Sequence, residues 1–218
     1  MSKRDFYNEK YSCKRLYTSS LFKEEFIFVL EQFGLSDRPR NILDLGGGTG
    51  EYSKMLMELG HNVVLFDFSQ VAIDKALEIG VSEAICGDFN SFDFKNRKFD
   101  VVFAKGFSLL NTDSKEDFAK CFAKIKSLLK NPDGFFLYWT STDFSERWGR
   151  SGWFNQNLNW FKIFFDRSTI LFSFRLQRLL PTFINFLIGM LIPFLPMRRD
   201  LVVVGIKKND GVENDHNY

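Results

Sequence analysis

The fold is decided by residues 41–69, NILDLGGGTGEYSKMLMELGHNVVLFDFS, in which four glycines fill five positions. The apolar runs NILDL and NVVLFD predict strands, and GEYSKMLMELG predicts an amphipathic helix that ends at Gly60. A glycine turn between a strand and a helix is typical of nucleotide sites, because backbone amides without side chains can approach a ligand at the helix N-terminus. We therefore expect a nucleotide site at this turn.

The spacing of the glycines narrows the choice of nucleotide. A dinucleotide fingerprint, GxGxxG, would place Glu51 or Ser53 at its last glycine, so it fails in both registers. A Walker A loop needs a lysine after its glycines, and no lysine follows these. The pattern that is present is DxGxGxG, over residues 44–50.

This pattern resembles the LDLGxGTG loop of the class I S-adenosylmethionine-dependent methyltransferases. Further stretches within residues 38–140 resemble other motifs of that family: VVLFDFS, CGDFNSFDF, KFDVVFAKG and LLKNPDGFFLYW. The resemblance implies an S-adenosylmethionine-dependent methyltransferase (EC 2.1.1.-), with S-adenosylhomocysteine as product and no metal.

The resemblance also implies roles for individual residues. Asp67 would accept hydrogen bonds from both ribose hydroxyls, and Asp88 would bind the adenine amino group. Phe89 would contribute either a backbone amide or an apolar ring contact. The residues allow other roles, because Asp67 could cap the following helix and Asp88 could cap a turn. We expect Asp44 to organise the amides of the glycine loop. The expected cofactor-binding residues are Asp44, Gly46, Gly47, Gly48, Gly50, Asp67, Phe68, Asp88, Phe89 and Lys105.

The alternation of strands and helices predicts an α/β fold with a parallel sheet covered on both faces. The family adds a Rossmann-like, doubly wound, seven-stranded, mostly parallel sheet with an antiparallel last strand. We expect one methyltransferase domain over residues 1–208, followed by a polar tail at 209–218. Within it lie an N-terminal arm and helix at 1–37, a cofactor-binding core at 38–140, an acceptor-side region at 141–199 and the last strand at 200–207.

Composition disfavours several classes of function. The net charge of the 218 residues is +2 without a lysine–arginine block, which disfavours nucleic acid. Two histidines make a histidine-rich metal centre unlikely, and we interpret His61 as a turn residue. Three cysteines without CxxC spacing indicate reduced thiols, and the charged N-terminus does not resemble a signal peptide. We expect a cytoplasmic protein, with membrane association left open.

Acceptor candidates follow the fourth and fifth strands, whose carboxyl ends should face the substrate. Methyl transfer is an in-line displacement, so alignment and exclusion of water matter most. Where many relatives carry a histidine this chain has Asn111, which leaves no obvious base. A small, apolar or lipid-like acceptor is expected. The candidates are Lys105, Ser108, Asn111, Thr140 and Asp143.

Two further segments could enclose the ligands. Tyr7 and Tyr11 could close over the cofactor, as N-terminal arms do in some relatives, or belong to a surface arm. Residues 140–167, together with Trp139, could form an aromatic wall of the acceptor pocket through their tryptophans.

The last third contains 18 consecutive uncharged residues, 179–196, between Arg178 and Arg198-Arg199. Their number would suffice for a membrane span. Prolines near both ends, and the strands on either side that belong to one sheet, argue against a span. A hydrophobic lid, a dimer surface and a helix lying in a membrane interface remain open.

A function of another class is also compatible with the fold. A non-catalytic methyltransferase-like module would use the same fold to bind a protein partner. The intact pattern of Gly46, Gly48, Gly50, Asp67 and Asp88 favours the enzyme, because such a module has no need of a cofactor site.

Overall fold

The computed structural model describes residues 2–13, 20–130, 134–142, 148, 152–156, 160, 163, 168–174, 181, 183, 184, 187 and 199–206. The first half of the fold comprises α1 (Lys3–Cys13), α2 (Ser20–Gln32), β1 (Asn41–Leu45), α3 (Glu51–Glu58), β2 (Asn62–Asp67) and α4 (Gln70–Glu78). The second half comprises β3 (Ala84–Cys86), β4 (Val101–Lys105), α5 (Lys115–Leu128), β5 (Phe135–Thr142), β6 (Ser168–Phe174) and β7 (Arg199–Ile206).

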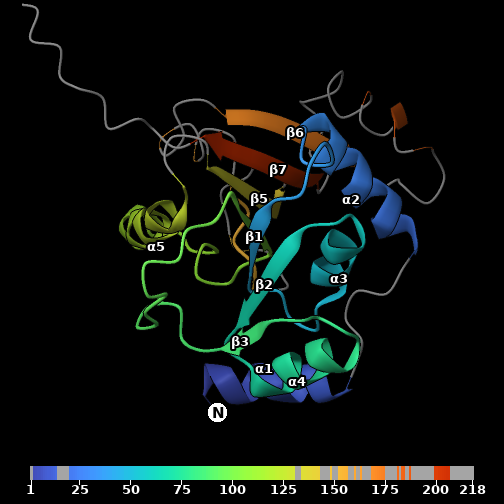
Figure 1. Cartoon of the computed structure of the whole chain (residues 1–218). Helices are drawn as coiled ribbons and strands as arrows, with labels where there is room; N and C mark the ends of the chain where they lie inside the picture. Colours follow the sequence, from blue (N-terminus) through green and yellow to red (C-terminus); the bar gives the residue numbers. More distant parts are fainter. Residues whose placement is uncertain are drawn as a thin grey trace, which may run out of the picture.

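The strands form one twisted sheet in the order β3-β2-β1-β4-β5-β7-β6 (Figure 1). Strands β1 to β5 are parallel to their neighbours, whereas β7 runs antiparallel to β5 and β6. The strand order reverses between β1 and β4, and a crevice beyond the carboxyl ends of the strands is expected at such a switch point. The doubly wound α/β fold predicted from the sequence is confirmed.

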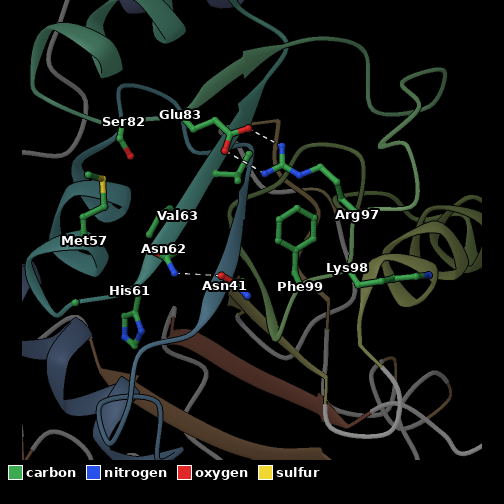
Figure 2. Close-up of a pocket in the computed structure, with 12 residues that line it drawn as sticks. Asn41, Met57, His61, Asn62, Val63, Ser82, Glu83, Arg97, Lys98 and Phe99 are labelled. Carbon is green, nitrogen blue, oxygen red and sulfur yellow. Dashed lines mark hydrogen bonds and ion pairs between the residues drawn. The ribbon is translucent and has the colours of Figure 1, made fainter.

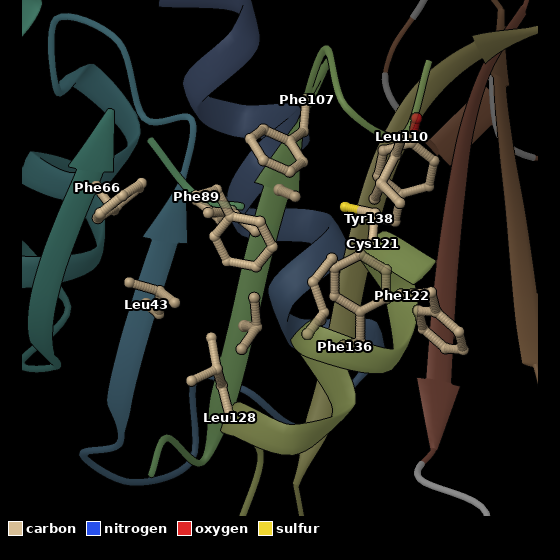
Figure 3. Close-up of a cluster of buried hydrophobic side chains, with 14 of the residues drawn as sticks. Leu43, Phe66, Phe89, Phe107, Leu110, Cys121, Phe122, Leu128, Phe136 and Tyr138 are labelled. Carbon is tan, nitrogen blue, oxygen red and sulfur yellow. The ribbon is translucent and has the colours of Figure 1, made fainter. Parts of the chain in front are cut away.

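One face of the sheet is covered by α5. Cys121, Phe122 and Leu128 of this helix pack toward sheet residues such as Phe136 and Tyr138 in one buried cluster (Figure 3). The helix begins after Ser114, whose hydroxyl accepts a hydrogen bond from the Asp117 N–H at 3.1 Å and so caps its first turn. Burial of these large aromatic side chains is the main source of stability on this face.

The other face is covered by α2 and α3, which lie on the opposite side of the sheet from α5 (Figure 1). Phe26 and Leu30 of α2 and Leu56 of α3 pack on Phe103 of β4. A third cluster joins α4 to β2 and contains Leu65, Ile73, Ala76 and Val81. Helices thus cover both faces, as the apolar runs of the central strands require.

The N-terminal region, for which the sequence allowed an arm or a short helix, contains helix α1. The candidate Asp143 lies outside the described residues, as do residues 131–133 before β5. Within the described part of the chain, no helix is both long and apolar enough to cross a bilayer.

Candidate functional site

A pocket of about 370 Å³ lies beyond the carboxyl ends of β1, β2 and β4. It therefore occupies the crevice expected at the switch point of the sheet. Its walls come from the glycine turn, the ends of β2 and β3, the loop after β4 and helix α1. The lining residues predicted from the sequence are Gly46, Asp67, Phe68, Asp88, Phe89, Ser108, Tyr7 and Tyr11.

The glycine turn has a backbone that only glycine adopts easily. Gly46, Gly48 and Gly50 have φ angles of +75°, +56° and +86°. A Cβ on Gly46 would lie 2.8 Å from the ring of Phe107, which lines the pocket. A Cβ on Gly50 would lie 2.9 Å from Ala76. The turn is therefore packed closely on both sides, and side chains added at these two glycines would clash with Phe107 and Ala76.

Asp67 is the last residue of β2 and lies buried at the edge of the pocket. Its Oδ2 accepts a hydrogen bond from the Gly48 N–H at 3.0 Å, and its Oδ1 accepts one from the Ser69 N–H at 2.9 Å. Burial raises the pKa of this carboxyl, and the two backbone N–H groups oppose the shift. The carboxylate thus fixes the glycine turn while its outer side faces the pocket.

The alternative that Asp67 caps α4 is corrected by the structure. The N-cap residue of α4 is Ser69, whose hydroxyl accepts a hydrogen bond from the Ala72 N–H. Asp67 instead holds the N–H of this capping serine. Its side chain therefore contributes to the start of α4 only through Ser69.

Asp44 is buried beneath the turn and is not among the described lining of the pocket. Its Oδ2 accepts a hydrogen bond from the Ser53 hydroxyl at 2.6 Å, which ties β1 to α3. Burial raises the pKa of Asp44 to about 7, and the nearby charges of Asp67 and Glu51 add to the shift. The expectation that Asp44 organises the loop amides is corrected, because Asp67 holds the Gly48 amide.

Gly47 leaves room for Asp44. A Cβ at this glycine would lie 2.8 Å from Asp44 Oδ2 and equally close to Leu65. The second glycine of the turn is thus required by the buried carboxyl beneath it.

Asp88 and Phe89 follow β3 and both line the pocket. Asp88 is exposed, and its Oδ1 accepts a hydrogen bond from the Asn90 N–H at 3.0 Å, so it also stabilises a turn. Phe89 is buried, with its ring centroid 6.2 Å from that of Phe66 and 5.6 Å from that of Phe107. Figure 3 labels these three rings, of which Phe66 belongs to β2, whereas Phe89 and Phe107 follow β3 and β4. They form an aromatic floor for the pocket.

Of the described residues proposed to contact the acceptor, only one lines the pocket. Ser108 lines the pocket, whereas Asn111 pairs with the backbone of Phe154, donating to its carbonyl at 2.8 Å and accepting from its N–H at 3.0 Å. Lys105 points to the α3 side, where its Nζ lies 2.5 Å from the Tyr52 hydroxyl and 3.9 Å from the Trp139 ring centroid. The described lining of the pocket does not include Lys105, Asn111 or the buried Thr140.

The four tryptophans also separate. Trp153 lies near the pocket, because a Cβ on the lining residue Gly106 would be 3.7 Å from its ring. Trp139 and Trp160 are buried in clusters on opposite faces of the sheet, and Trp148 is largely exposed. The four tryptophans therefore do not form a common wall of the pocket, and only Trp153 lies near it.

Helix α1 forms one side of the pocket, through Arg4, Tyr7 and Tyr11. It is attached to α4 by hydrogen bonds from Ser69 Oγ to Asn8 Oδ1 and from Lys75 Nζ to the Tyr11 carbonyl, both 2.5 Å long. The Tyr7 ring contacts Phe68 edge-on, and Tyr11 is only 8% exposed. The surface-arm alternative is wrong for this helix.

Several lining residues were missed from the sequence, namely Arg4, Phe66, Asn90, Gly106, Phe107 and Leu109. Phe107 and Leu109 could have been predicted. Because β1 and β4 are adjacent strands, the loop after β4 lies beside the glycine turn after β1. No sequence signal marked Arg4, because its place depends on how α1 docks against α4.

A larger cavity, of about 530 Å³, lies at the opposite edge of the sheet (Figure 2). It is lined by the first residues of β1 and β2, Asn41 and Asn62, and by the ion pair of Glu83 and Arg97. His61 borders it, but its ring is buried and burial lowers its pKa. We assign the site to the smaller pocket, because ligands of open parallel sheets bind beyond the carboxyl ends of the strands.

Comparison with known proteins agrees with this geometry. Residues 42–134 match a family model described as a methyltransferase domain. A search of curated proteins found no match. The matched residues contain the glycine turn and the ends of β2, β3 and β4, which together form most of the pocket.

Solved structures show the same fold at low sequence identity. A phosphoethanolamine N-methyltransferase from Haemonchus contortus is 19% identical, with a TM-score of 0.64 over 95% of this chain and 60% of its own. An S-adenosylmethionine-dependent methyltransferase from Clostridium acetobutylicum is 14% identical, with a TM-score of 0.58 over 88% of this chain and 93% of its own. The CcbJ methyltransferase from Streptomyces caelestis is 22% identical, with a TM-score of 0.50 over 67% of this chain and 58% of its own.

The chain thus spans about three fifths of the length of two of these proteins and nearly all of the third. Residues 42–134 thus match a methyltransferase-domain family, and the fold is the one seen in solved S-adenosylmethionine-dependent methyltransferases.

Proposed function

We propose that the pocket binds S-adenosylmethionine and that the chain methylates a small, apolar or lipid-like molecule by in-line displacement. The observation that carries the proposal is the position of Asp67, whose buried carboxylate holds the glycine turn and also faces the pocket. Each of its oxygens accepts one backbone N–H, which leaves each with capacity for a hydroxyl donor. Two adjacent ribose hydroxyls match this arrangement.

The other residues of the site would contact different parts of the cofactor. Asp88 would accept a hydrogen bond from the adenine amino group, and Phe68 and Phe89, which also line the pocket, would contribute apolar contacts to the cofactor. Gly46 and Gly48 bring backbone close to the methionine portion, and Gly47, Gly50 and Asp44 support their geometry. No side chain fits beside Gly46, because a Cβ there would lie 2.8 Å from the Phe107 ring, so the backbone itself borders the pocket.

Lys105 has a supporting role in this proposal. Its ammonium joins the end of β4 to Tyr52, in the first turn of α3, just after the glycine loop. It thereby fixes the loop from the side away from the pocket. Asn111 likewise holds the loop after β4 against Phe154.

The acceptor is expected beside Ser108 and Leu109. S-adenosylmethionine supplies a methyl group on a positively charged sulfur, which departs as a neutral thioether. The chain's part is to align the nucleophile and exclude water, for which the apolar side chains of Phe107 and Leu109 are suited. Ser108 offers the acceptor a hydroxyl for orientation.

Neighbouring structures support a small acceptor. The Haemonchus contortus enzyme was solved with phosphomonomethylethanolamine and S-adenosylhomocysteine, and DhpI was solved with S-adenosylmethionine and HEP. Both complexes pair the cofactor with a second small molecule. By analogy, we expect a small molecule to occupy the Ser108 side of this pocket.

The test is calorimetric titration with S-adenosylmethionine and S-adenosylhomocysteine. Wild-type protein should bind both with micromolar affinity, and Asp67→Ala should weaken binding by at least about a hundredfold, because two charge-assisted hydrogen bonds are lost. Asp74→Ala, which removes an exposed carboxylate from α4, is the matched control and should bind normally. Absence of binding by folded wild-type protein would favour the non-catalytic module.

A further inference from the structure

The loop after β3, called here the β3 loop and comprising residues 88–92, carries three of the residues that line the pocket. It is a tight turn, in which the N–H groups of Ser91 and Phe92 both donate to the Asp88 carbonyl, at 3.2 and 2.8 Å. The Asp88 carboxylate accepts a further hydrogen bond from the Asn90 N–H at 3.0 Å. The direction of this carboxylate is therefore set by the conformation and the position of the β3 loop.

The β3 loop is attached to α5 by Lys124. The Lys124 Nζ donates hydrogen bonds to the Asn90 carbonyl at 3.1 Å and to the Phe92 carbonyl at 2.9 Å. The same ammonium lies over the ring of Phe89, 5.1 Å from its centroid. Charged donors form stronger hydrogen bonds than neutral ones, and the face of an aromatic ring attracts a cation. One half-buried side chain thus contacts three of the five residues in the loop.

Apolar packing alone does not fix the β3 loop in this way. Phe89 is 2% exposed and belongs to the same buried cluster as Cys121 and Ile125 of α5. Contacts of this kind are not directional, so they hold the ring in the core without determining how the polar turn faces. Two hydrogen bonds from one ammonium to two carbonyls do determine it, because each depends on distance and angle. Lys124 therefore sets the orientation of the loop relative to the sheet.

We propose that Lys124 is a positioning residue of the cofactor site, which aims the Asp88 carboxylate at the adenine amino group by holding the β3 loop against α5. This inference rests on the proposed function, in which Asp88 binds adenine. Lys124 itself is not in the described lining of the pocket, so it acts through the loop. A fixed carboxylate accepts a hydrogen bond from the amino group of adenine and repels the carbonyl oxygen that hypoxanthine carries at the same position. Selectivity for adenine thus depends on Lys124.

The experiment is calorimetric titration of the full chain with S-adenosylhomocysteine and with S-inosylhomocysteine, in which a carbonyl oxygen replaces the amino group. Wild-type protein should bind S-adenosylhomocysteine at least about tenfold more tightly. Lys124→Met, which keeps an apolar side chain but removes the ammonium, should weaken binding of S-adenosylhomocysteine by about tenfold and reduce the preference for it to about threefold or less.

Two further variants serve as controls. Lys124→Arg should restore most of the affinity and of the preference, because a guanidinium can donate to both carbonyls. Lys120→Met removes an exposed lysine one turn earlier on α5 and should behave like wild type.

Amide exchange tests the same inference without a ligand. In the free protein, the Ser91 and Phe92 amides should exchange about tenfold faster in Lys124→Met than in wild type. Unchanged exchange would overturn the inference. So would normal wild-type binding with a preference for adenine that Lys124→Met retains, because a merely structural role lowers stability but not selectivity. Failure of folded wild-type protein to bind S-adenosylhomocysteine would instead overturn the proposed function, and the inference with it.

Discussion

Asp67 shows how much of the site depends on a single side chain. One oxygen holds the Gly48 N–H on the loop after β1, and the other holds the Ser69 N–H at the start of α4. The same carboxylate lines the pocket. A residue of this kind couples the geometry of two loops to ligand binding, so its loss affects both at once.

At the same scale, we expect the variant Gly46→Ala to strain the backbone and also to displace a side chain that lines the pocket. The left-handed φ costs an alanine about 1 kcal/mol here and at Gly60, where φ is +89° and the space is open. At Gly46 the Cβ also meets Phe107, so the ring must move into the pocket. Urea unfolding should show Gly46→Ala to be at least about 1 kcal/mol less stable than the Gly60→Ala control.

Calorimetry completes the comparison of these two alanine variants. Gly46→Ala should lose cofactor binding, whereas Gly60→Ala should keep it because Gly60 lies on the other edge of the sheet. Equal affinity in the two variants would show that the space beside Gly46 is not used by the ligand.

At the scale of elements, α1 closes one side of the pocket without belonging to the sheet. It contacts α4 through Asn8 and Tyr11 and contributes Arg4 and Tyr7 to the lining. Its own residues carry little apolar surface, so its position depends on these few polar and ring contacts. We therefore expect the helix to open more readily than the core.

Asn8→Ala combined with Lys75→Ala should release α1. Two hydrogen bonds to α4 are lost, which should weaken cofactor affinity by about tenfold while leaving the unfolding midpoint nearly unchanged. Amide exchange in α1 should accelerate, and calorimetry measures the affinity. Lys54→Ala is the matched control, because Lys54 also donates to a carbonyl, that of Ile79. An unaltered affinity in the double variant would mean that α1 is not part of the site.

At the scale of the molecule, the sheet separates two cavities with different chemistry. The carboxyl edge gathers the glycine turn and two carboxylates, whereas the amino edge carries amides and the Glu83–Arg97 ion pair. Burying carboxyls at one edge has a cost, because burial raises the pKa of both Asp44 and Asp67, and the charge of Asp67 adds to the shift of Asp44. Stability should therefore depend on pH.

The sign of this dependence follows from Asp44. Its folded-state pKa of about 7 lies above the ordinary value of 3.8, so between these values the folded chain holds a proton that the unfolded chain has released. Stability should fall as the pH rises through this window, by up to about 4 kcal/mol, and level off above it. The raised pKa of Asp67 acts in the same direction.

Urea unfolding at several pH values between about 5 and 8 measures this slope. Asp44→Asn keeps an oxygen for Ser53 but removes the charge, so its slope should be shallower and its stability at the upper pH higher. Asp74→Asn, on the exposed side of α4, should retain the wild-type slope. Parallel curves for Asp44→Asn and wild type would contradict the assignment.

Much of the fold and of the pocket could be predicted because the signals are local. The glycine turn, the apolar strands and the capping serine at Ser114 each depend on a few neighbouring residues. In a parallel sheet, residues that end successive strands meet at one edge, so Asp67 and Asp88 were correctly expected beside Gly46.

The errors concern side chains whose role depends on packing. Asp44 was expected to bind loop amides, yet the direction of its side chain under the turn places it against Ser53. Lys105 and Asn111 lie near the right edge of the sheet but point to Tyr52 and Phe154.

By itself, the sequence determined the α/β fold and the edge of the sheet that carries the glycine turn, because these depend on periodicity and on glycines that no other residue replaces. The expected class of cofactor came from the resemblance of several motifs to a known family. Only the tertiary structure decided which side chains enter the pocket. Arg4 reaches it because α1 docks on α4, and Lys105 does not because alternate residues of a strand face opposite sides of the sheet. Such orientations depend on contacts between distant segments, which no local pattern records.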